Sequence, residues 1–325
     1  MRISVYLALA ASVLLTVVAP AAGRRLPPGR AAAVLAVAAV TAGCGWAWDL
    51  ALLAWTLIGQ LGVVRRFGHW SGPVLAAHDP VPPVTAGVAV VLVCVVAATT
   101  AVSALRCGRD VSWLLRTARR APVVAAGGLV VVDDPAPAAL ALPGRPGRVL
   151  VTSSLLRALS AAERRVLFAH EQSHLRHAHL GYRLLVRLAA GLNPLLWPMV
   201  ADCDYVLERW ADEDAATAVA DRGLAAAALA RAALATNASG TGTARAGTAR
   251  SGTGPSSGAT GPAMSAFQEH TVTRRVAALL GPPPPSRWLP AVGPAVLGLI
   301  AAVCAVEAGR EIDRMFDLAL YVWPR

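Results

Sequence analysis

The sequence predicts a mainly α-helical membrane protein, in which four spanning helices accompany one polar domain of helices and a small β-hairpin. Three observations support this fold class. Only 15% of the 325 residues are charged, against about 25% in a typical soluble domain. Several apolar runs reach the roughly 20 residues that a helix needs to cross a bilayer. A long, more polar stretch separates the third of these runs from the fourth.

The apolar runs differ in length and in purity. Three contain no charged residue, whereas the run at 31–64 contains Asp49 and is too long for one plain span. We interpret it as one tilted helix that extends beyond the bilayer; a hairpin hinged near Gly43, Gly45 and Asp49 is the alternative. The first run exceeds the apolar core of a usual signal peptide, which favours a retained span over a cleaved one. The predicted spans cover about 3–22, 34–62, 84–105 and 288–306.

The arginines set the predicted orientation of these spans. They are concentrated after the first and third spans, whereas the loop between the second and third holds only Arg65 and Arg66. By the positive-inside rule, the arginine-rich loops are cytoplasmic. We therefore expect a multi-pass protein of the plasma membrane, with its polar domain in the cytoplasm and both termini outside.

The net charge of +11 comes from arginine alone, because the chain contains no lysine. The arginines are scattered and no aromatic-rich basic platform accompanies them, so we expect no direct binding of nucleic acid. Those beside the spans favour the anionic headgroups of the lipid bilayer as their partner. The five cysteines are dispersed without a CxxC pair, which argues against a disulfide framework or a thiolate metal site.

The polar domain begins with short strands. After a basic continuation of the third span, an apolar run at 128–132 is typical of a strand. The runs at 138–142 and 148–152 flank a turn of proline and glycine, which predicts a β-hairpin. Either of these two strands, if exposed at an edge, would take up an extended peptide as an added strand. Ordinary core packing is the alternative for both.

Helices follow the hairpin. Ser160 and Glu163 form the Ser-x-x-Glu pattern of a capping box, which begins a helix through at least His177. Residues 182–200 are apolar but interrupted by arginines and prolines, so we interpret them as a buried or interfacial helix and a turn. A second strong helix is expected from about 200 to 221.

The rest of the polar region is expected to contain little structure. Residues 237–263 are almost all Gly, Ser, Thr and Ala; they lack the apolar side chains of a core and predict a flexible linker. A short helix at 272–280 and four prolines follow. The predicted domains are thus the first three spans (1–106), the polar domain (107–236), the linker (237–263), a connector (264–287), the fourth span (288–306) and a short external tail (307–325).

Four of the seven histidines lie in residues 168–179, FAHEQSHLRHAH. This stretch contains His170-Glu171-x-x-His174 on the predicted helix. Positions i and i+4 of a helix lie above one another, so both imidazoles can bind one zinc ion, with Glu171 as general base for a water molecule there. The pattern should arise by chance only about 0.003 times in a chain of this composition. A histidine-rich solvated face is therefore the weaker alternative.

A catalytic zinc usually has a third protein ligand. Glu208 and Asp212, some 30 residues downstream, share one face of the second strong helix. Glu208 can complete a His₂Glu set, while Asp212 can hydrogen-bond to a ligand histidine. The alternatives for the third ligand are Glu213, Asp204 and Asp202, and a merely solvated acidic face remains the alternative for all of them.

The pattern HExxH, followed by ExxxD within ERWADEDAA, resembles the gluzincin membrane proteases of the HtpX and CAAX-prenyl-protease type. It is most similar to the BlaR/MecR-type antibiotic-sensor metallopeptidases, which share the order of spans, the hairpin, NPLLW between the metal helices and RRVAALL before the last span. The resemblance implies one zinc ion bound by His170, His174 and Glu208, with Glu171 as catalytic base and Asp212 in support. His179 matches a histidine often present in these families; we favour a hydrogen-bonding role for it over substrate contact.

The chain departs from the BlaR/MecR pattern after its last span. The sensors carry a large extracellular penicillin-binding domain there, whereas about 19 residues follow here. A Ser-x-x-Lys acylation motif cannot exist in a chain without lysine. We therefore do not expect this chain to sense β-lactams directly.

These observations predict a membrane-bound zinc-dependent endopeptidase that cleaves a protein substrate at the cytoplasmic face. By the resemblance, the substrate is a transcriptional repressor of the BlaI/MecI type, or the chain itself. A quality-control protease for membrane proteins is one alternative. A non-catalytic receptor or scaffold that retains a zinc site is another.

Overall fold

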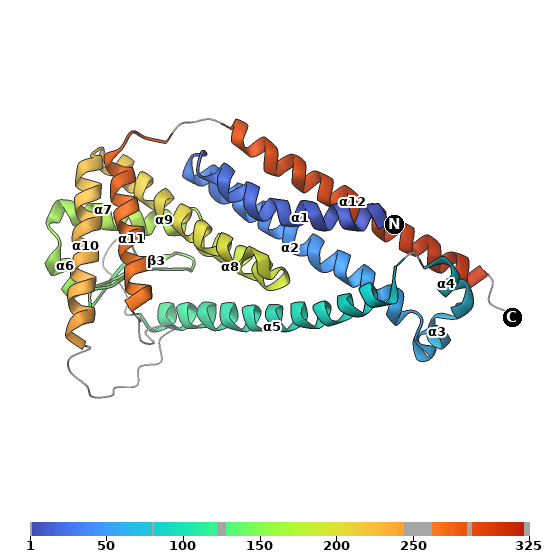
Figure 1. The fold of residues 1–325 in the computed structure, drawn as a ribbon. Coiled ribbons are helices and arrows are strands. Elements are labelled where there is room, and N and C mark those ends of the chain that lie inside the picture. The colour runs from blue at the N-terminus through green and yellow to red at the C-terminus, as the bar shows by residue number, and fades with distance from the viewer. Residues whose placement is uncertain (1, 80, 122–127, 244–261, 285–287, 322–325) are drawn as a thin grey trace. The chain divides into compact units, whose positions relative to one another are not determined.

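The structure, a computed structural model, describes residues 2–79, 81–121, 128–243, 262–284 and 288–321. Within these residues it contains twelve α-helices and one three-stranded sheet (Figure 1), which confirms the predicted mainly α class. The chain divides into two compact units. The first comprises residues 1–105, 182–203 and 286–325, and the second comprises residues 106–181 and 204–285.

Four helices of the described residues are long and apolar enough to cross a membrane, as predicted. Most of them extend beyond the predicted spans, because a helix continues past its apolar segment wherever the next residues favour helix. Helix α5, for example, runs from the third span through the basic residues up to Arg120. The four helices are α1 (Arg2–Gly23), α2 (Pro28–Ile58), α5 (Pro83–Arg120) and α12 (Val292–Tyr321).

Helix α2 is continuous from Pro28 to Ile58, so a single helix in the second run is confirmed over these residues and the hairpin alternative is wrong. Gly43 has a packing role instead of a hinge role. A Cβ atom at this position would lie 2.8 Å from the carbonyl oxygen of Ala189, on helix α8 (His179–Leu192). Glycine therefore permits the close approach of the two helices. Asp49 is fully buried within the same unit.

Two short helices that the sequence did not predict follow α2: α3 (Gly62–Gly68) and α4 (Gly72–His78). The indole of Trp70 between them donates to the carbonyl of Gly59 at 2.8 Å. The same indole forms a T-shaped contact with the ring of Phe316 on α12, with the ring centroids 4.9 Å apart. Because Phe316 and its neighbours are buried, α12 continues through most of the predicted tail; residues 322–325 lie outside the described part.

Helix α8 belongs to the same unit as the spans for most of its length, together with the 3₁₀-helix η1 (Pro194–Leu196) and the first turns of α9 (Trp197–Val219). The hydroxyl of Thr99 on α5 donates to the carbonyl of Gly191 at 2.6 Å. The expected buried or interfacial helix is thus present. Its packing against the spans divides the predicted domain 107–236 between the two units.

The second unit contains the sheet, formed by β1 (Leu129–Val132), β2 (Ala139–Leu142) and β3 (Arg148–Thr152). The predicted hairpin is confirmed, with β2 antiparallel to β3 and Leu140 opposite Leu150. Strand β1 pairs in parallel with the other side of β3. Because β3 is the central strand, the expectation that 148–152 could accept an added strand is wrong. Strand β2 remains available as an edge.

Helices α6 (Ser153–Ala158) and α7 (Ala161–Arg176) follow the sheet. The capping box at the start of α7 is confirmed: Ser160 Oγ accepts from the Glu163 backbone N–H at 3.3 Å, and Glu163 accepts from the Ser160 backbone N–H at 2.8 Å. Arg231, on helix α10 (Arg222–Thr243), also donates to the Glu163 carboxylate at 2.9 Å. Helix α7 ends at Arg176, one residue before the predicted limit, because Ala178 takes a positive φ of 50°.

We expect Ser160→Ala to destabilise the protein by about 1 kcal/mol, the usual effect of losing an N-cap side chain. Burial opposes ionisation of Glu163, but the hydrogen bonds from Ser160 and the charge of Arg231 lower its pKa below the usual value of 4.5. The stabilisation from Glu163 is therefore complete above that value and is lost as the pH falls through the lowered pKa. Thermal unfolding of purified protein measures both effects. An unchanged midpoint for Ser160→Ala at pH 7 would contradict this prediction.

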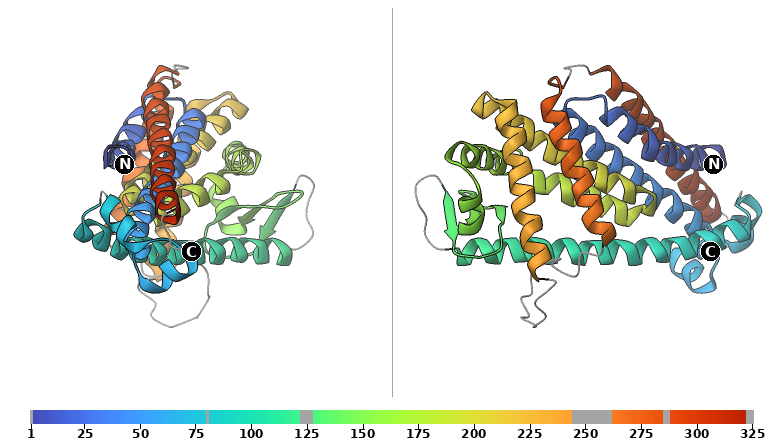
Figure 2. Two further views of the ribbon diagram at one scale, coloured as in Figure 1. Left: turned by 90° about the vertical axis from the view of Figure 1, so that its right-hand side faces the viewer. Right: turned by 60° about the vertical axis from the view of Figure 1, so that its left-hand side comes forward.

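Two helices complete the second unit and run side by side (Figure 2): α10 (Arg222–Thr243) and α11 (Pro262–Leu280). Helix α10 continues seven residues into the predicted linker, and residues 244–261 lie outside the described part. Helix α11 begins ten residues before the predicted short helix. Leu279 is buried in a core with Val166 of α7 and Ala215 of α9. The segment expected to be a connector thus forms part of the second unit.

Candidate metal centre

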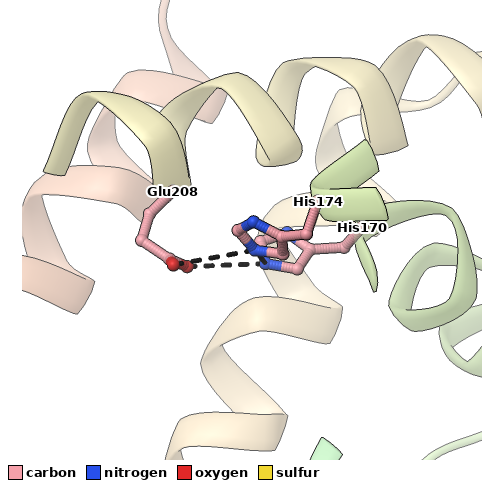
Figure 3. A group of neighbouring side chains, drawn as sticks. All are labelled: His170, His174 and Glu208. Atoms are coloured by element: carbon pink, nitrogen blue, oxygen red, sulfur yellow. Dashed lines mark hydrogen bonds and ion pairs between the residues drawn. The ribbon is translucent and has the colours of Figure 1, made fainter. Parts of the chain in front are cut away.

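Helices α7 and α9 bring three potential metal ligands together in the second unit (Figure 3). His170 and His174 lie one turn apart on α7, and their Nε2 atoms are 3.2 Å apart. The carboxylate of Glu208 on α9 points at both rings, with Oε2 3.5 Å from His170 Nε2 and Oε1 3.6 Å from His174 Nε2. The two elements that the sequence predicted separately thus meet at one point.

These separations fit a zinc ion. Four ligand atoms at about 2.0–2.1 Å from zinc in a tetrahedron lie roughly 3.3 Å from one another. The three observed separations lie close to this value on either side. Two imidazoles and one carboxylate are also a common donor set of catalytic zinc sites, which leave the fourth position for water or substrate.

Two further side chains orient the imidazoles. Asp212, one turn after Glu208, is buried, and its Oδ1 lies 3.1 Å from His170 Nδ1. When His170 is neutral, as a metal ligand must be, its Nδ1–H group would donate to Asp212 and its Nε2 lone pair would face the centre. On the other imidazole, His174 Nδ1 lies 2.6 Å from Nδ1 of the buried His179. This contact gives His179 the geometry of a hydrogen-bonding partner.

The electrostatics of the group favour a cation. Burial alone would lower the pKa of His170, but hydrogen bonds to Asp212 and Glu208 raise it to about 10. Burial alone would raise the pKa of each carboxyl group. Hydrogen bonds and nearby positive charges together outweigh burial and lower both pKa values; the leading contributions are the hydrogen bond from His170 at Glu208 and that from Arg275 at Asp212. The buried carboxylate of Asp212 and the partly buried carboxylate of Glu208 therefore stay ionised beside the imidazoles, as a site for a divalent metal requires.

Sequence reasoning missed Arg275, which lies on α11. Its guanidinium donates to both oxygens of Asp212, from Nε at 2.7 Å and from Nη2 at 2.6 Å. Its Nη1 also lies 3.1 Å from Glu208 Oε2. Arg275 is 63 residues from Asp212 in the chain, and no local pattern links the two. Its only signal was the Arg-Arg pair within RRVAALL.

The family model of peptidase family M48 matches residues 112–282, which is just over half of the chain. The chain belongs to peptidase family M48. This family covers the HtpX and CAAX-prenyl-protease-type gluzincins, so membership and the four apolar helices together make the chain a membrane-associated zinc metallopeptidase. No curated protein and no solved structure matches the chain significantly.

In the described part of this M48 peptidase, the donor group consists of His170, His174 and Glu208. The alternative third ligands are not part of it; these were Glu213, Asp204 and Asp202. Glu213 instead forms an ion pair with Arg222 at the start of α10. A neighbouring acid, Asp214, accepts from the hydroxyl of Ser173 at 2.7 Å and lies 2.9 Å from His177 Nε2. These contacts connect α7 and the residue that follows it to α9.

The donor group of His170, His174 and Glu208 borders a cavity of about 420 Å³ within the second unit. Glu171, which is 9% exposed, lines this cavity together with His170, Glu208, Asp212 and Arg275. The rest of the wall is mainly apolar and comes from α6, α7, α10 and α11. The beginning of the edge strand β2 and the residues just before it, 137–139, also line the cavity. Two of the three potential ligands, Glu171 and the beginning of β2 therefore border one cavity.

Proposed function

We propose that this M48 peptidase is an endopeptidase of the plasma membrane, which cleaves a protein substrate at the cytoplasmic face. The observation that carries the proposal is the close approach of His170, His174 and Glu208, at the separations of a tetrahedral zinc site. These residues would hold one zinc ion, which when bound polarises the scissile carbonyl and makes water nucleophilic at neutral pH.

Glu171 acts as the general base in this proposal. It follows ligand His170 in the chain and lines the same cavity. Its carboxylate takes a proton from the attacking water and then passes it to the leaving amine. Asp212 and His179 keep the two ligand imidazoles in their orientation, because an imidazole that turns or changes tautomer no longer presents its lone pair.

The substrate binds as an extended peptide along strand β2. An unpaired edge offers backbone N–H and C=O groups to an added strand. Residues at the start of β2 line the cavity that contains Glu171, so an added strand would carry its backbone to the metal group. The apolar walls favour an apolar side chain beside the scissile bond.

The resemblance to the BlaR/MecR type supports a cytoplasmic transcriptional repressor of the BlaI/MecI type as the substrate. The supporting features are the four spans, the position of the peptidase region between the third and the fourth, and the capped metal helix. Incubation of the purified protein with such a repressor tests this assignment. Cleavage of damaged membrane proteins in preference to the repressor would instead favour a quality-control protease.

Metal removal tests the proposed reaction. We expect a chelator to stop cleavage of an unfolded model protein by the purified full-length peptidase, because the remaining side chains cannot activate water alone. Addition of zinc in excess of the chelator should restore cleavage, and addition of magnesium should not, because magnesium prefers oxygen ligands. Cleavage that continues at the same rate in the chelator would show that the activity does not depend on the metal.

The orientation is tested with single cysteines in a background that lacks the five native ones. We expect a membrane-impermeant maleimide to label Phe67→Cys in intact cells, because Phe67 is 82% exposed on α3, between the second and third spans. The matched variant Ala136→Cys, exposed between β1 and β2, should react only after permeabilisation. The reverse labelling pattern would place the peptidase region outside the cytoplasm.

A further inference from the structure

Arg275 is a buried cation at the donor group that belongs to neither HExxH nor ExxxD. Its side chain is about 10% exposed and its guanidinium faces two carboxylates of α9. Nε and Nη2 form a bidentate pair with Asp212, while Nη1 lies 3.1 Å from Glu208. The planar guanidinium is suited to this task, because its donors point in fixed directions.

The contacts of Arg275 reach the proposed ligands by two routes. Asp212 Oδ1 lies 2.6 Å from Arg275 Nη2 and 3.1 Å from His170 Nδ1. A carboxylate clamped by Arg275 therefore holds the His170 ring in place. By the second route, Arg275 contacts the proposed ligand Glu208 directly and holds its carboxylate. Both routes favour the geometry in which the donor atoms of α7 and α9 face each other.

Arg274, the preceding residue, offers an internal comparison. Its guanidinium carbon lies 4.2 Å from the centroid of the Tyr205 ring, also on α9. Arg274 is exposed. Like Arg275, it lies on α11 and contacts α9. It differs from Arg275 in that it stacks on a ring, whereas Arg275 pairs with the carboxylates of Glu208 and Asp212.

Charge and positioning predict opposite effects of Arg275 on metal affinity. A cation 3.1 Å from Glu208 repels a divalent metal, so by charge alone its removal should tighten metal binding. A clamp that orients Glu208 and Asp212 should instead strengthen binding, because disordered ligands must be ordered again by the metal. The sign of the change therefore separates the two effects.

We propose that Arg275 is a positioning residue of the metal centre. Helix α11, which follows residues 244–261 in the sequence, is then a required part of that centre. The inference rests on the proposed zinc site. Arg275 lies 63 positions after Asp212, on a helix other than α7 and α9, so in this proposal α7 and α9 need α11 to complete the site. Zinc affinity thus depends on how α11 packs against α9.

The test measures zinc affinity of the purified full-length protein by competition with a chromophoric chelator, and the absorption spectrum after substitution with Co²⁺. Arg275→Lys keeps the charge but loses the planar fork. We expect it to bind zinc about 10–100-fold more weakly, the usual effect of losing a partner of a metal ligand, and to alter the Co²⁺ spectrum. Arg274→Lys should leave both unchanged. Arg275→Met, which also removes the charge, should weaken zinc binding as well.

Several outcomes would overturn the proposal. Arg275→Lys with the zinc affinity and Co²⁺ spectrum of the parent would show that the fork positions nothing. Tighter binding by Arg275→Met would show that charge alone matters. An equal loss in Arg274→Lys would show a general effect of α11 packing. If the parent protein binds no zinc, the proposed function itself fails. If the parent and Arg275→Lys bind zinc with equal affinity, only the role of Arg275 fails. Far-UV circular dichroism tests whether each variant is folded, and Arg275→Lys retains the positive charge beside Asp212 and Glu208.

Discussion

Glu171→Gln is expected to abolish proteolysis while leaving zinc bound. Glutamine is nearly isosteric with glutamate but cannot accept a proton, so the attacking water is no longer deprotonated. General base catalysis contributes about 10²–10⁴-fold to rates, and we expect a loss of at least this size in kcat. Because Glu171 is outside the donor group of His170, His174 and Glu208, zinc content should remain that of the parent.

Cleavage of a quenched fluorescent protein substrate and metal analysis of the same preparation measure the two quantities together. Glu307→Gln is a suitable control, since Glu307 is a partly exposed residue of α12 that pairs with Arg310 and Arg314. A Glu171→Gln variant that cleaves as fast as the parent would refute the proposed mechanism. A variant that loses both zinc and activity would show that Glu171 is needed for the site to form.

Glu208→Ala is expected to lose the metal as well as the activity. It removes one of three proposed ligands, so we expect zinc affinity to fall by more than the 10–100-fold that loss of an outer partner typically costs. It also deprives the buried Arg275 of one of its two carboxylate partners. Removal of one partner of a buried ion pair destabilises proteins by about 3–5 kcal/mol. Because Asp212 continues to pair with Arg275, the loss of stability should be at the lower end of this range or below it.

Glu213→Ala is the matched control for this variant, because Glu213 lies on the same helix and pairs with Arg222, outside the donor group. Elemental analysis after gel filtration gives the zinc content, and thermal unfolding with and without added zinc gives the stability. We expect zinc to raise the melting temperature of the parent and of Glu213→Ala, but not of Glu208→Ala. One tightly bound zinc per chain in Glu208→Ala would exclude Glu208 as a required ligand.

The features that could be predicted from the sequence have local physical causes. The spans follow from runs of about 20 apolar residues, since each run must satisfy its own backbone hydrogen bonds in lipid. The start of α7 follows from two side chains three residues apart, Ser160 and Glu163, which pair with each other's backbone. The juxtaposition of His170 and His174 follows from the helical repeat. The hairpin of β2 and β3 follows from two apolar runs around a proline and glycine turn.

Features that depend on contacts between distant segments could not be predicted in this way. Composition alone did not distinguish Glu208 from Glu213 as the third ligand; the rotation of α9 against α7 turns one toward the imidazoles, while Arg222 pairs with the other. The parallel pairing of β1 made β3 the central strand, so that only β2 of the two hairpin strands lies at an edge of the sheet. The close approach at Gly43 showed a packing contact where a hinge was the alternative.

By itself, the sequence determined the four apolar helices, the capped metal helix and the pair of histidines, because helical periodicity and burial in lipid act over neighbouring residues. Only the tertiary structure decided which acid faces the imidazoles, which strand has a free edge, and that Arg275 of α11 clamps Asp212 and Glu208. These outcomes depend on how helices far apart in the chain pack against one another, and packing is set by the shapes and charges of all the side chains at the contact.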